Sequence, residues 1–391
     1  MKKKYLALFI AATLMFSSVS VFGETSSATA NDTSSVTEQD QSLWNESLWN
    51  EYTDYITVDK DSSLATLTLE DATKKAINNS SSIKNTSASI DLTDTTLESS
   101  YNSAMAGDDD GGFSSLISFI NSKTSYENSI TNLDAEKASL KHSVKSSYIS
   151  LIETQRDIEL LKMNLKIEDN NLTIAKAKYN LGKLSKSDLE TEEKTYNDDK
   201  TTLVNKQDAL EKDYKALNIL IGASIDTRYN FVLDPVYKPF EISMPVDSYI
   251  NGKVALSNSV AQAKKTYESK KQTSSLSSIS NSEIGGYQSA QNSLNSAKMS
   301  YDDKKDDVYQ SLLSKYNDCM ENEKSYKSNV EQLRLLKNTL ERTQANYQNG
   351  KATELDLLKA KYNVAKLENT MVSEIYSHML LVEELADTNL M

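Results

Sequence analysis

The chain repeats itself, and this repeat limits the folds open to it more than any other feature. The segment from Tyr179 to Leu189 matches the segment from Tyr347 to Leu357 at an offset of 168 residues. In both segments a tyrosine is followed, at steps of three residues, by a glycine, by a serine or threonine, and by an aspartate. A leucine comes directly after the aspartate. Apolar residues recur every seven positions around both segments over five or six heptads. That spacing is typical of coiled-coil helices, so the sequence predicts two tandem copies of one long helical hairpin.

The heptad rows indicate which positions face a neighbouring helix. Before the tip, the row reads Val144, Leu151, Ile158, Leu165, Leu172 in the first copy and Leu312, Cys319, Tyr326, Leu333, Leu340 in the second. After the tip, it reads Leu189, Tyr196, Leu203, Leu210, Leu217 and then Leu357, Val364, Met371, His378, Leu385. Cys319 and His378 thus stand where the first copy has leucines. We interpret both as residues packed between helices.

Glycine and proline, which most turns require, are scarce. The 391 residues include 10 glycines and 3 prolines, about a quarter of the usual combined share of roughly 12%. β-Sandwiches, propellers and doubly wound α/β folds need many more turns than these residues can supply. The sequence therefore predicts an all-α fold of two tandem repeats of long antiparallel coiled-coil helices. We place these helices at residues 68–104, 113–181, 186–221, 247–279, 287–349 and 354–388.

Five parts follow from this pattern. Residues 1–23 have the basic start, short apolar run and small residues of a signal peptide, and residues 24–66 form a flexible, acidic leader rich in Ser and Thr. Residues 67–222 are the first helical repeat and residues 247–391 the second. The linker between them, residues 223–246, holds all three prolines.

Both tryptophans of the chain lie in a tandem pentapeptide of the leader. Trp44 and Trp49 occupy the same position of two successive Ser-Leu-Trp-Asn-Glu units. They could pin the leader to the outside of the helical body. Alternatively, they could contact a membrane interface or a partner, since tryptophan favours sites between an apolar environment and water.

Charge and residue content exclude several classes of function. The formal net charge is −13, and loss of the three lysines of the signal peptide leaves 40 basic against 56 acidic residues, or −16. Such a chain lacks the basic surface that nucleic acids require. The single cysteine cannot form an internal disulfide. No phosphate-binding loop, nucleophile elbow or zinc-ligand spacing is present, so we expect no enzyme, no cofactor and no metal site.

The two tip motifs have the residues of a built turn between helices. Gly182 and Gly350 can adopt the left-handed backbone that ends a helix. Ser185 precedes Asp188, and Thr353 precedes Asp356, by the three residues of a capping box. We therefore expect helix–turn–helix tips, with both long hairpins pointing the same way.

With these features, the chain resembles the TolC family of outer-membrane efflux proteins. The resemblance covers residues 67–390 and includes the tip motif, which occurs twice. It also rests on Leu67–Ala72 with Ala76–Asn79, on their counterpart Ala255–Val260, and on Tyr148 and Tyr316, each 34 residues before a tip glycine.

The resemblance implies an export duct. Three copies of the chain would form a hollow α-helical barrel that docks with an adaptor (membrane fusion) protein and an inner-membrane exporter. The residues facing the adaptor would be Tyr179, Gly182, Ser185, Asp188, Leu189, Tyr347, Gly350, Thr353, Asp356 and Leu357.

The same resemblance implies an acidic ring at the narrow end of the duct. Three copies each of Asp188 and Asp356 would form it, and capping of their helices is an alternative and compatible role. Lys359 stands where some relatives place a second ring aspartate, and Ala352 where a relative can carry a basic gate residue. Both departures argue against a tightly closed, cation-selective constriction.

The end opposite the tips departs further from the family. There, each repeat of the family inserts two membrane-spanning strands, which need more than about 20 residues. The matching windows, residues 104–112 and 272–286, are too short and lack an aromatic girdle. We therefore predict that the β-barrel strands are absent or vestigial. The signal peptide indicates export to the cell envelope: to the outer membrane by resemblance, or to a periplasmic or cell-wall-associated place without the barrel.

A second class of function fits a long coiled coil. The chain could be a structural envelope or surface protein without a channel. Such a rod would more often show one continuous heptad seam and would not need two matched tips. The repeated tips therefore favour the duct.

Overall fold

The computed structural model describes residues 56, 58, 61–106, 112–233, 236–279 and 284–390. The predicted signal peptide, both tryptophans of the leader and the turn at residues 107–111 lie outside this part of the chain. No helix within the described part is both long enough and apolar enough to cross a membrane.

Nearly all described residues are helical, which confirms the predicted all-α fold. The first repeat consists of α4 (Leu69–Asn79), α5 (Ser81–Met105), α6 (Gly112–Asn180) and α7 (Lys186–Ile221). The second consists of α8 (Val246–Leu256), α9 (Asn258–Ile279), α10 (Ile284–Gln348) and α11 (Glu354–Ala386), followed by the 3-10 turn η2 (Thr388–Leu390).

The first helix of each repeat is interrupted, which the sequence analysis did not predict. The helix expected at residues 68–104 breaks at Ser80, whose side chain accepts a hydrogen bond from the backbone N–H of Ile83 and so caps α5. The helix expected at residues 247–279 breaks at Ser257, which has an extended backbone. Serine is a poor helix-interior residue but a good cap, because its hydroxyl competes for nearby backbone groups.

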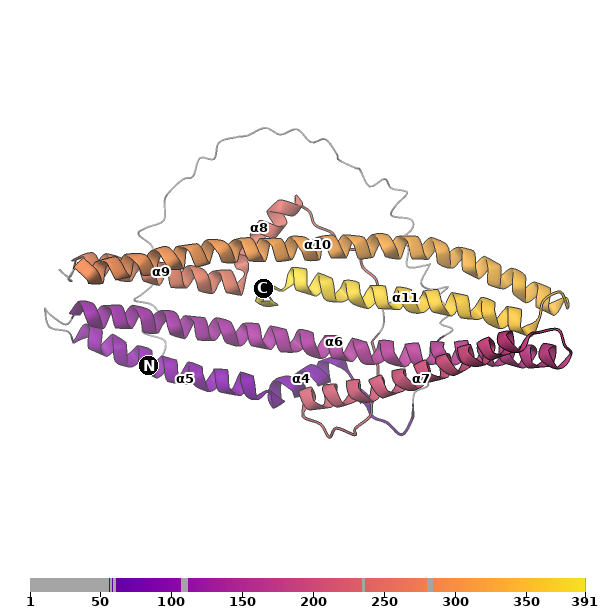
Figure 1. The fold of residues 1–391 in the computed structure, drawn as a ribbon. Coiled ribbons are helices and arrows are strands. Elements are labelled where there is room, and N and C mark those ends of the chain that lie inside the picture. The colour runs from indigo at the N-terminus through magenta and orange to yellow at the C-terminus, as the bar shows by residue number, and fades with distance from the viewer. Residues whose placement is uncertain are drawn as a thin grey trace, which may run out of the picture. The chain divides into compact units, whose positions relative to one another are not determined.

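The helices form one layer in which each long helix lies beside shorter ones (Figure 1). α6 packs against α4, α5 and α7 of its own repeat and against α9 and α11 of the other. α10 packs against α8, α9 and α11. The layer therefore runs from α7 through α6 and α11 to α10, which leaves α7 and α10 at its two edges. Both long hairpins turn at the same end, as the sequence predicted.

The linker is tied to the first repeat by a strand pair. β1 (Thr66–Leu67) pairs in parallel with β2 (Asn230–Phe231), with Thr66 opposite Asn230. Asn230 also accepts a hydrogen bond from the backbone of Asp61 at 3.1 Å. Asp61 and Thr66, in a stretch that the sequence analysis assigned to the leader, thus contact the linker.

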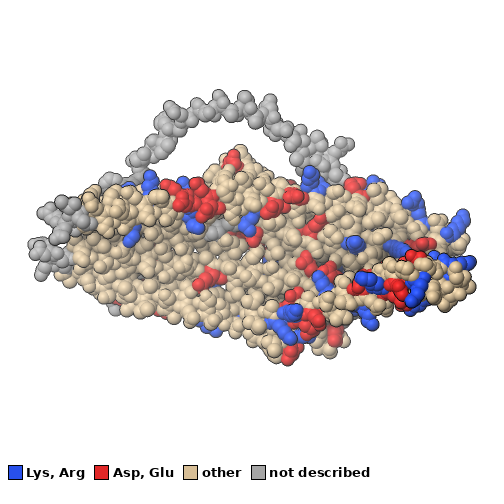
Figure 2. Space-filling model, in the orientation of Figure 1, with Lys and Arg blue, Asp and Glu red and all other residues tan. Residues whose placement is uncertain are grey.

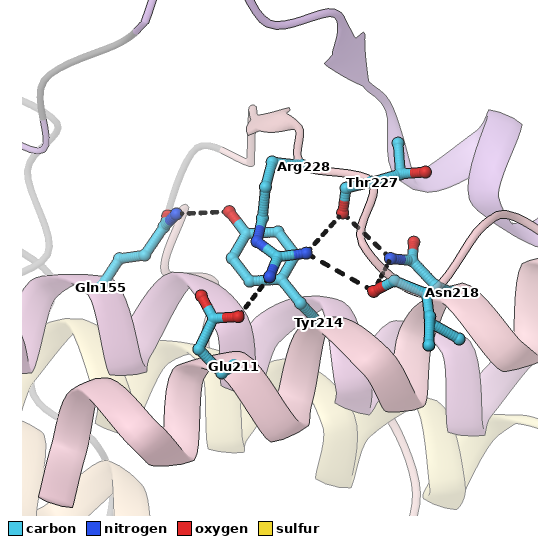
Figure 3. A network of polar contacts seen from close by, with 7 residues as sticks. Gln155, Glu211, Tyr214, Asn218, Thr227 and Arg228 are labelled. Carbon is cyan, nitrogen blue, oxygen red and sulfur yellow. Dashed lines mark hydrogen bonds and ion pairs between the residues drawn. The ribbon is translucent and has the colours of Figure 1, made fainter.

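A polar network holds the start of the linker on α7 (Figure 3). The guanidinium of Arg228 lies over the ring of Tyr214, 4.7 Å from its centroid, and pairs with Glu211. The hydroxyl of Tyr214 accepts a hydrogen bond from Gln155 at 2.9 Å. Asn218 donates to the carbonyl of Thr227 at 3.0 Å. These contacts join α6, α7 and the linker.

Each repeat has its own apolar core, built largely from the predicted heptad rows. The first centres on Val144, Tyr148, Leu151 and Leu217, and the second on Ile250, Leu312, Cys319 and Leu385. Cys319 and His378 are both buried, as the heptad alignment indicated.

Candidate functional site

The two hairpin tips have the geometry that their motifs predict. Gly182 and Gly350 have φ angles of 68° and 69°, in the left-handed region that favours glycine. At the first tip, Lys183 N–H donates to the carbonyl of Lys178 at 2.8 Å. At the second, Lys351 N–H donates to the carbonyl of Asn346 at the same distance. Both tips are Schellman turns, in which these bonds satisfy the last carbonyls of the long helix.

The short helices begin on capping residues, and the two caps differ. At the first tip, the Ser185 hydroxyl accepts from Asp188 N–H at 3.1 Å. At the second tip, Thr353 accepts from Asp356 N–H at 3.1 Å, and Asp356 also accepts from Thr353 N–H at 2.9 Å. This reciprocal capping box lowers the pKa of Asp356, first through the backbone bond of Thr353 and then through its hydroxyl.

The tip side chains form an open surface. Tyr179, Asp188, Tyr347 and Asp356 are exposed, and the motif leucines are half-buried. Neither glycine has any atom near the place where a Cβ would stand. The tips therefore offer tyrosine rings, carboxylates and accessible backbone, which suits recognition of another protein more than binding of a small molecule in a pocket.

Polar contacts fix the two hairpins side by side behind the tips. Lys359 on α11 donates to Asn171 on α6 at 3.2 Å. Further along, Asn369 on α11 accepts from Arg156 at 3.2 Å and donates to Asp157 at 2.7 Å, both on α6. Lys359 thus helps to join the two repeats.

The two ends of the helical unit differ in charge. Figure 2 shows acidic and basic side chains gathered toward the tips, whereas the visible face at the opposite end is largely uncharged. The sequence agrees, since residues 112–122 and 284–297 contain no charged residue. Both stretches are helical, as are residues 98–105 and 272–279 beside them.

The sequence analysis missed how the linker crosses the second repeat. Tyr237 stacks on Tyr326 with ring centroids 4.2 Å apart and lies 5.1 Å from the ring of His378. The backbone N–H of Phe240 donates to Glu323 at 2.6 Å. Glu323 also lies 2.9 Å from Nε2 of His378. Residues equally far along the sequence from a tip face each other in a hairpin. This rule could have predicted that Glu323 on α10 lies beside His378 on α11.

No protein-family model matches the chain, and no curated protein matches it by sequence. The fold, however, matches solved structures of outer-membrane channels. CusC, studied for folding and transmembrane channel formation, has a TM-score of 0.63 and 11% identity over 86% of this chain and 96% of its own. The open MtrE channel of Neisseria gonorrhoeae has a TM-score of 0.59 and 14% identity, covering 87% and 95%. The CmeC channel of Campylobacter jejuni has a TM-score of 0.57 and 12% identity, covering 94% of each chain.

The resemblance to the TolC family is therefore confirmed at the level of the fold. The chain spans nearly the whole length of these structures, so the likeness includes both repeats and not a single coiled-coil hairpin. The matched structures are channel proteins rather than enzymes.

Proposed function

We propose that three copies of this chain assemble head to tail into a helical export duct in the cell envelope. The tips of the duct dock with an adaptor protein, which connects it to an inner-membrane exporter. The family resemblance supplies the number of copies and the kinds of partner. The observation that carries the assembly is a mismatch in burial between equivalent faces of the two repeats.

One face of α6 is buried, and the equivalent face of α10 is exposed. On α6 the face comprises Ala138, Ile149, Arg156 and Ile167, all buried. On α10, 168 residues later, it comprises Asp306, Asn317, Lys324 and Leu335, all exposed. α6 lies inside the layer and packs on the second repeat, whereas α10 forms an edge. The face on α10 therefore corresponds to an interface of the first repeat but has no neighbour among the described residues of one chain.

The opposite edge shows the complementary mismatch. α11 buries Ala365, Asn369, Val372 and Tyr376, and the equivalent residues of α7, which are Asn197, Thr201, Val204 and Asp208, are exposed. Within the chain, Arg156 on the α6 face bonds Asn369 on the α11 face. A second copy can repeat this joint by placing its α7 face on the α10 face of the first. Two unlike faces that join head to tail form a closed ring when the rotation closes.

The tips support docking with an adaptor. Both tips lie at the same end of the helical layer, so a ring of three chains would present all of them together as a rim. Asp188 and Asp356 are exposed at that end. In the ring, three copies of each carboxylate would line the narrow opening while they keep their hydrogen bonds to the capping residues Ser185 and Thr353.

Cross-linking tests the geometry of the joint. Between the repeats, Arg156 on α6 contacts Asn369 on α11, and the equivalent residues are Lys324 on α10 and Thr201 on α7. With Cys319→Leu as background, the pair Lys324→Cys and Thr201→Cys should give covalent trimers with a short thiol-to-thiol cross-linker. The matched control pairs Thr201→Cys with Ser325→Cys, one residue on and about 100° around the helix, and should give far less product.

Light scattering with negative-stain images tests the duct itself. We expect a trimer with a hollow end view. Leu335→Glu, which places a charge on the α10 face, should give monomers. Leu181→Glu, at a tip position that is also exposed, should leave the trimer intact but weaken adaptor binding. An extended monomer at high concentration, with no hollow ring, would overturn the proposal in favour of a structural rod.

A further inference from the structure

A cysteine, a glutamate and a histidine meet in the core of the second repeat. Cys319 and Glu323 lie one turn apart on α10, and His378 faces them from α11. One ligand atom of each, namely the Cys319 sulfur, a Glu323 carboxylate oxygen and a His378 ring nitrogen, lies within 4.8 Å of the other two. Cys319 and His378 are buried and Glu323 is partly buried, so the donors converge where water has little access.

We propose that these three side chains bind a zinc ion. Thiolate, imidazole and carboxylate are the side-chain ligands that zinc accepts, and three of them leave the fourth tetrahedral position open for a further ligand. The carboxylate favours zinc over copper(I), which selects softer thiolate and thioether ligands. Contraction of the distances within the triad to those of a zinc site requires only side-chain movement, because the two helices already hold the donors together.

The surroundings of Glu323 suit a metal ligand. Its Oε1 atom lies 2.9 Å from Nε2 of His378 and accepts the Phe240 N–H at 2.6 Å. A backbone donor behind a carboxylate is the kind of outer-shell contact that orients a ligand. Burial and the charge of Glu323 raise the pKa of the Cys319 thiol to about 12. Zinc binding therefore releases that thiol proton to solvent, and the cation offsets the cost of the buried thiolate.

The first repeat shows that packing alone does not require this triad. At the equivalent positions it has Leu151, Gln155 and Leu210. There Leu151 is fully buried, and Gln155 donates to Tyr214 at 2.9 Å. The same helix pairing is thus achieved without three ionisable groups. In the second repeat, zinc would join α10 to α11 directly beneath Tyr237 and Phe240, and so would stabilise the linker where it crosses the hairpin.

Zinc titration of the metal-free, full-length chain tests the proposal. We expect zinc to raise the midpoint of thermal unfolding and to protect Cys319, the only thiol, from alkylation in urea too dilute to unfold the chain. Cobalt(II) in place of zinc should give thiolate-to-metal charge-transfer absorption. A monomeric chain should bind zinc equally well, so the result is independent of duct assembly.

Substitutions copied from the first repeat separate metal binding from packing. Cys319→Leu, Glu323→Gln and His378→Leu introduce residues that the equivalent layer already accommodates. Each should weaken zinc binding more than about 100-fold, since loss of an outer-shell partner alone costs 10–100-fold. His142→Gln, which removes the other histidine and copies Gln310, should leave the affinity unchanged. The proposal would be overturned if zinc did not shift the unfolding midpoint. It would also be overturned if Glu323→Gln and His378→Leu bound zinc as tightly as the unaltered chain.

Discussion

At one layer of the fold, the first repeat packs Leu151 against its core where the second packs Cys319. Around these residues the helices, the tip glycines and the capping positions correspond. The difference shows that a heptad position in this fold requires a side chain that fills the space between the helices, but does not require a particular chemical type of side chain. The two repeats can therefore serve as controls for each other.

The repeats also use the linker differently. The first repeat receives it as a strand, β2, and holds it through the hydroxyl of Tyr148, which accepts Val232 N–H at 2.9 Å. The second repeat contacts the linker through Tyr237 and Phe240. The Tyr237 ring packs on side chains of α10 and α11, and the Phe240 N–H donates to Glu323 on α10. The linker is thus part of both cores and not only a connection between them.

The largest expected difference lies in the shared core layer. Leu151→Ala should lower the free energy of unfolding by about 2–5 kcal/mol, because it leaves a cavity at a fully buried site. In the metal-free chain, Cys319→Ala removes a single heavy atom and should cost about 1 kcal/mol. Urea unfolding of both variants measures this. Equal losses would contradict the view that the two layers differ in side-chain volume.

The next effect distinguishes two kinds of left-handed glycine. Gly222→Ala should cost more than about 2 kcal/mol, because its Cβ would lie 2.5 Å from Oδ1 of Asn79 in addition to backbone strain. Gly182→Ala and Gly350→Ala, which meet no neighbour, should cost only the strain, about 1–2 kcal/mol. Thermal unfolding of the three variants tests this order, and equal midpoints would refute it.

A third comparison concerns the equivalent tyrosines on the long helices. Tyr148→Phe should cost about 1–3 kcal/mol, since it leaves the Val232 N–H and the Leu67 carbonyl without a buried partner. The Tyr316 hydroxyl has no hydrogen bond to the described residues, so Tyr316→Phe should cost less than about 0.5 kcal/mol. Denaturant midpoints provide the measurement. A larger loss in Tyr316→Phe would reverse the assignment.

Smaller effects should separate the two tips. Thr353→Ala and Ser185→Ala each remove an N-cap, which typically costs about 1 kcal/mol. Both hydroxyls donate to the aspartate three residues on. The loss should be larger at Thr353, because there Asp356 also accepts the backbone N–H of Thr353, and loss of the hydroxyl weakens the hold on that carboxylate. Hydrogen exchange of the first turns of α7 and α11 reports each tip separately. The prediction would be contradicted if Ser185→Ala sped exchange at the start of α7 more than Thr353→Ala sped it at the start of α11.

The smallest effect is a pH dependence at the second tip. Contacts with Thr353 lower the pKa of Asp356 in the folded chain. Its contribution to stability is therefore complete above the unfolded pKa of about 3.9 and is lost as the pH falls through the lower, folded value. Acid should speed exchange at the start of α11, and Asp356→Asn should remove this pH dependence. An unchanged profile in that variant would refute the cause.

The tips could be predicted because their determinants are local. Gly182 and Ser185 act within one helical turn, so the motif specifies the backbone directly. The heptads likewise predicted the hairpins and the burial of Cys319 and His378. The breaks at Ser80 and Ser257 were missed because serine has no unique effect inside a long polar helix, and only its neighbours decide whether it caps.

The contacts of the linker could not be predicted, because they depend on tertiary packing. Tyr237 and Phe240 lie over 80 residues from the α10 residues that they contact, and no periodicity connects them. The pairing of Glu323 with His378 was within reach, since both lie nearly equally far from Gly350. It requires the hairpin register in addition to the heptad row.

The unlike exposed faces of α7 and α10 have a consequence for mixed populations of subunits. A chain altered only on α10, such as Leu335→Glu, can still join a neighbour through α7, and would then end the growing arc. If a complete ring needs three sound joints, the fraction of complete rings falls with the cube of the fraction of unaltered chains. In the proposed duct, a minority of such subunits would therefore suppress export by the majority, and the alteration would be dominant in a cell that makes both.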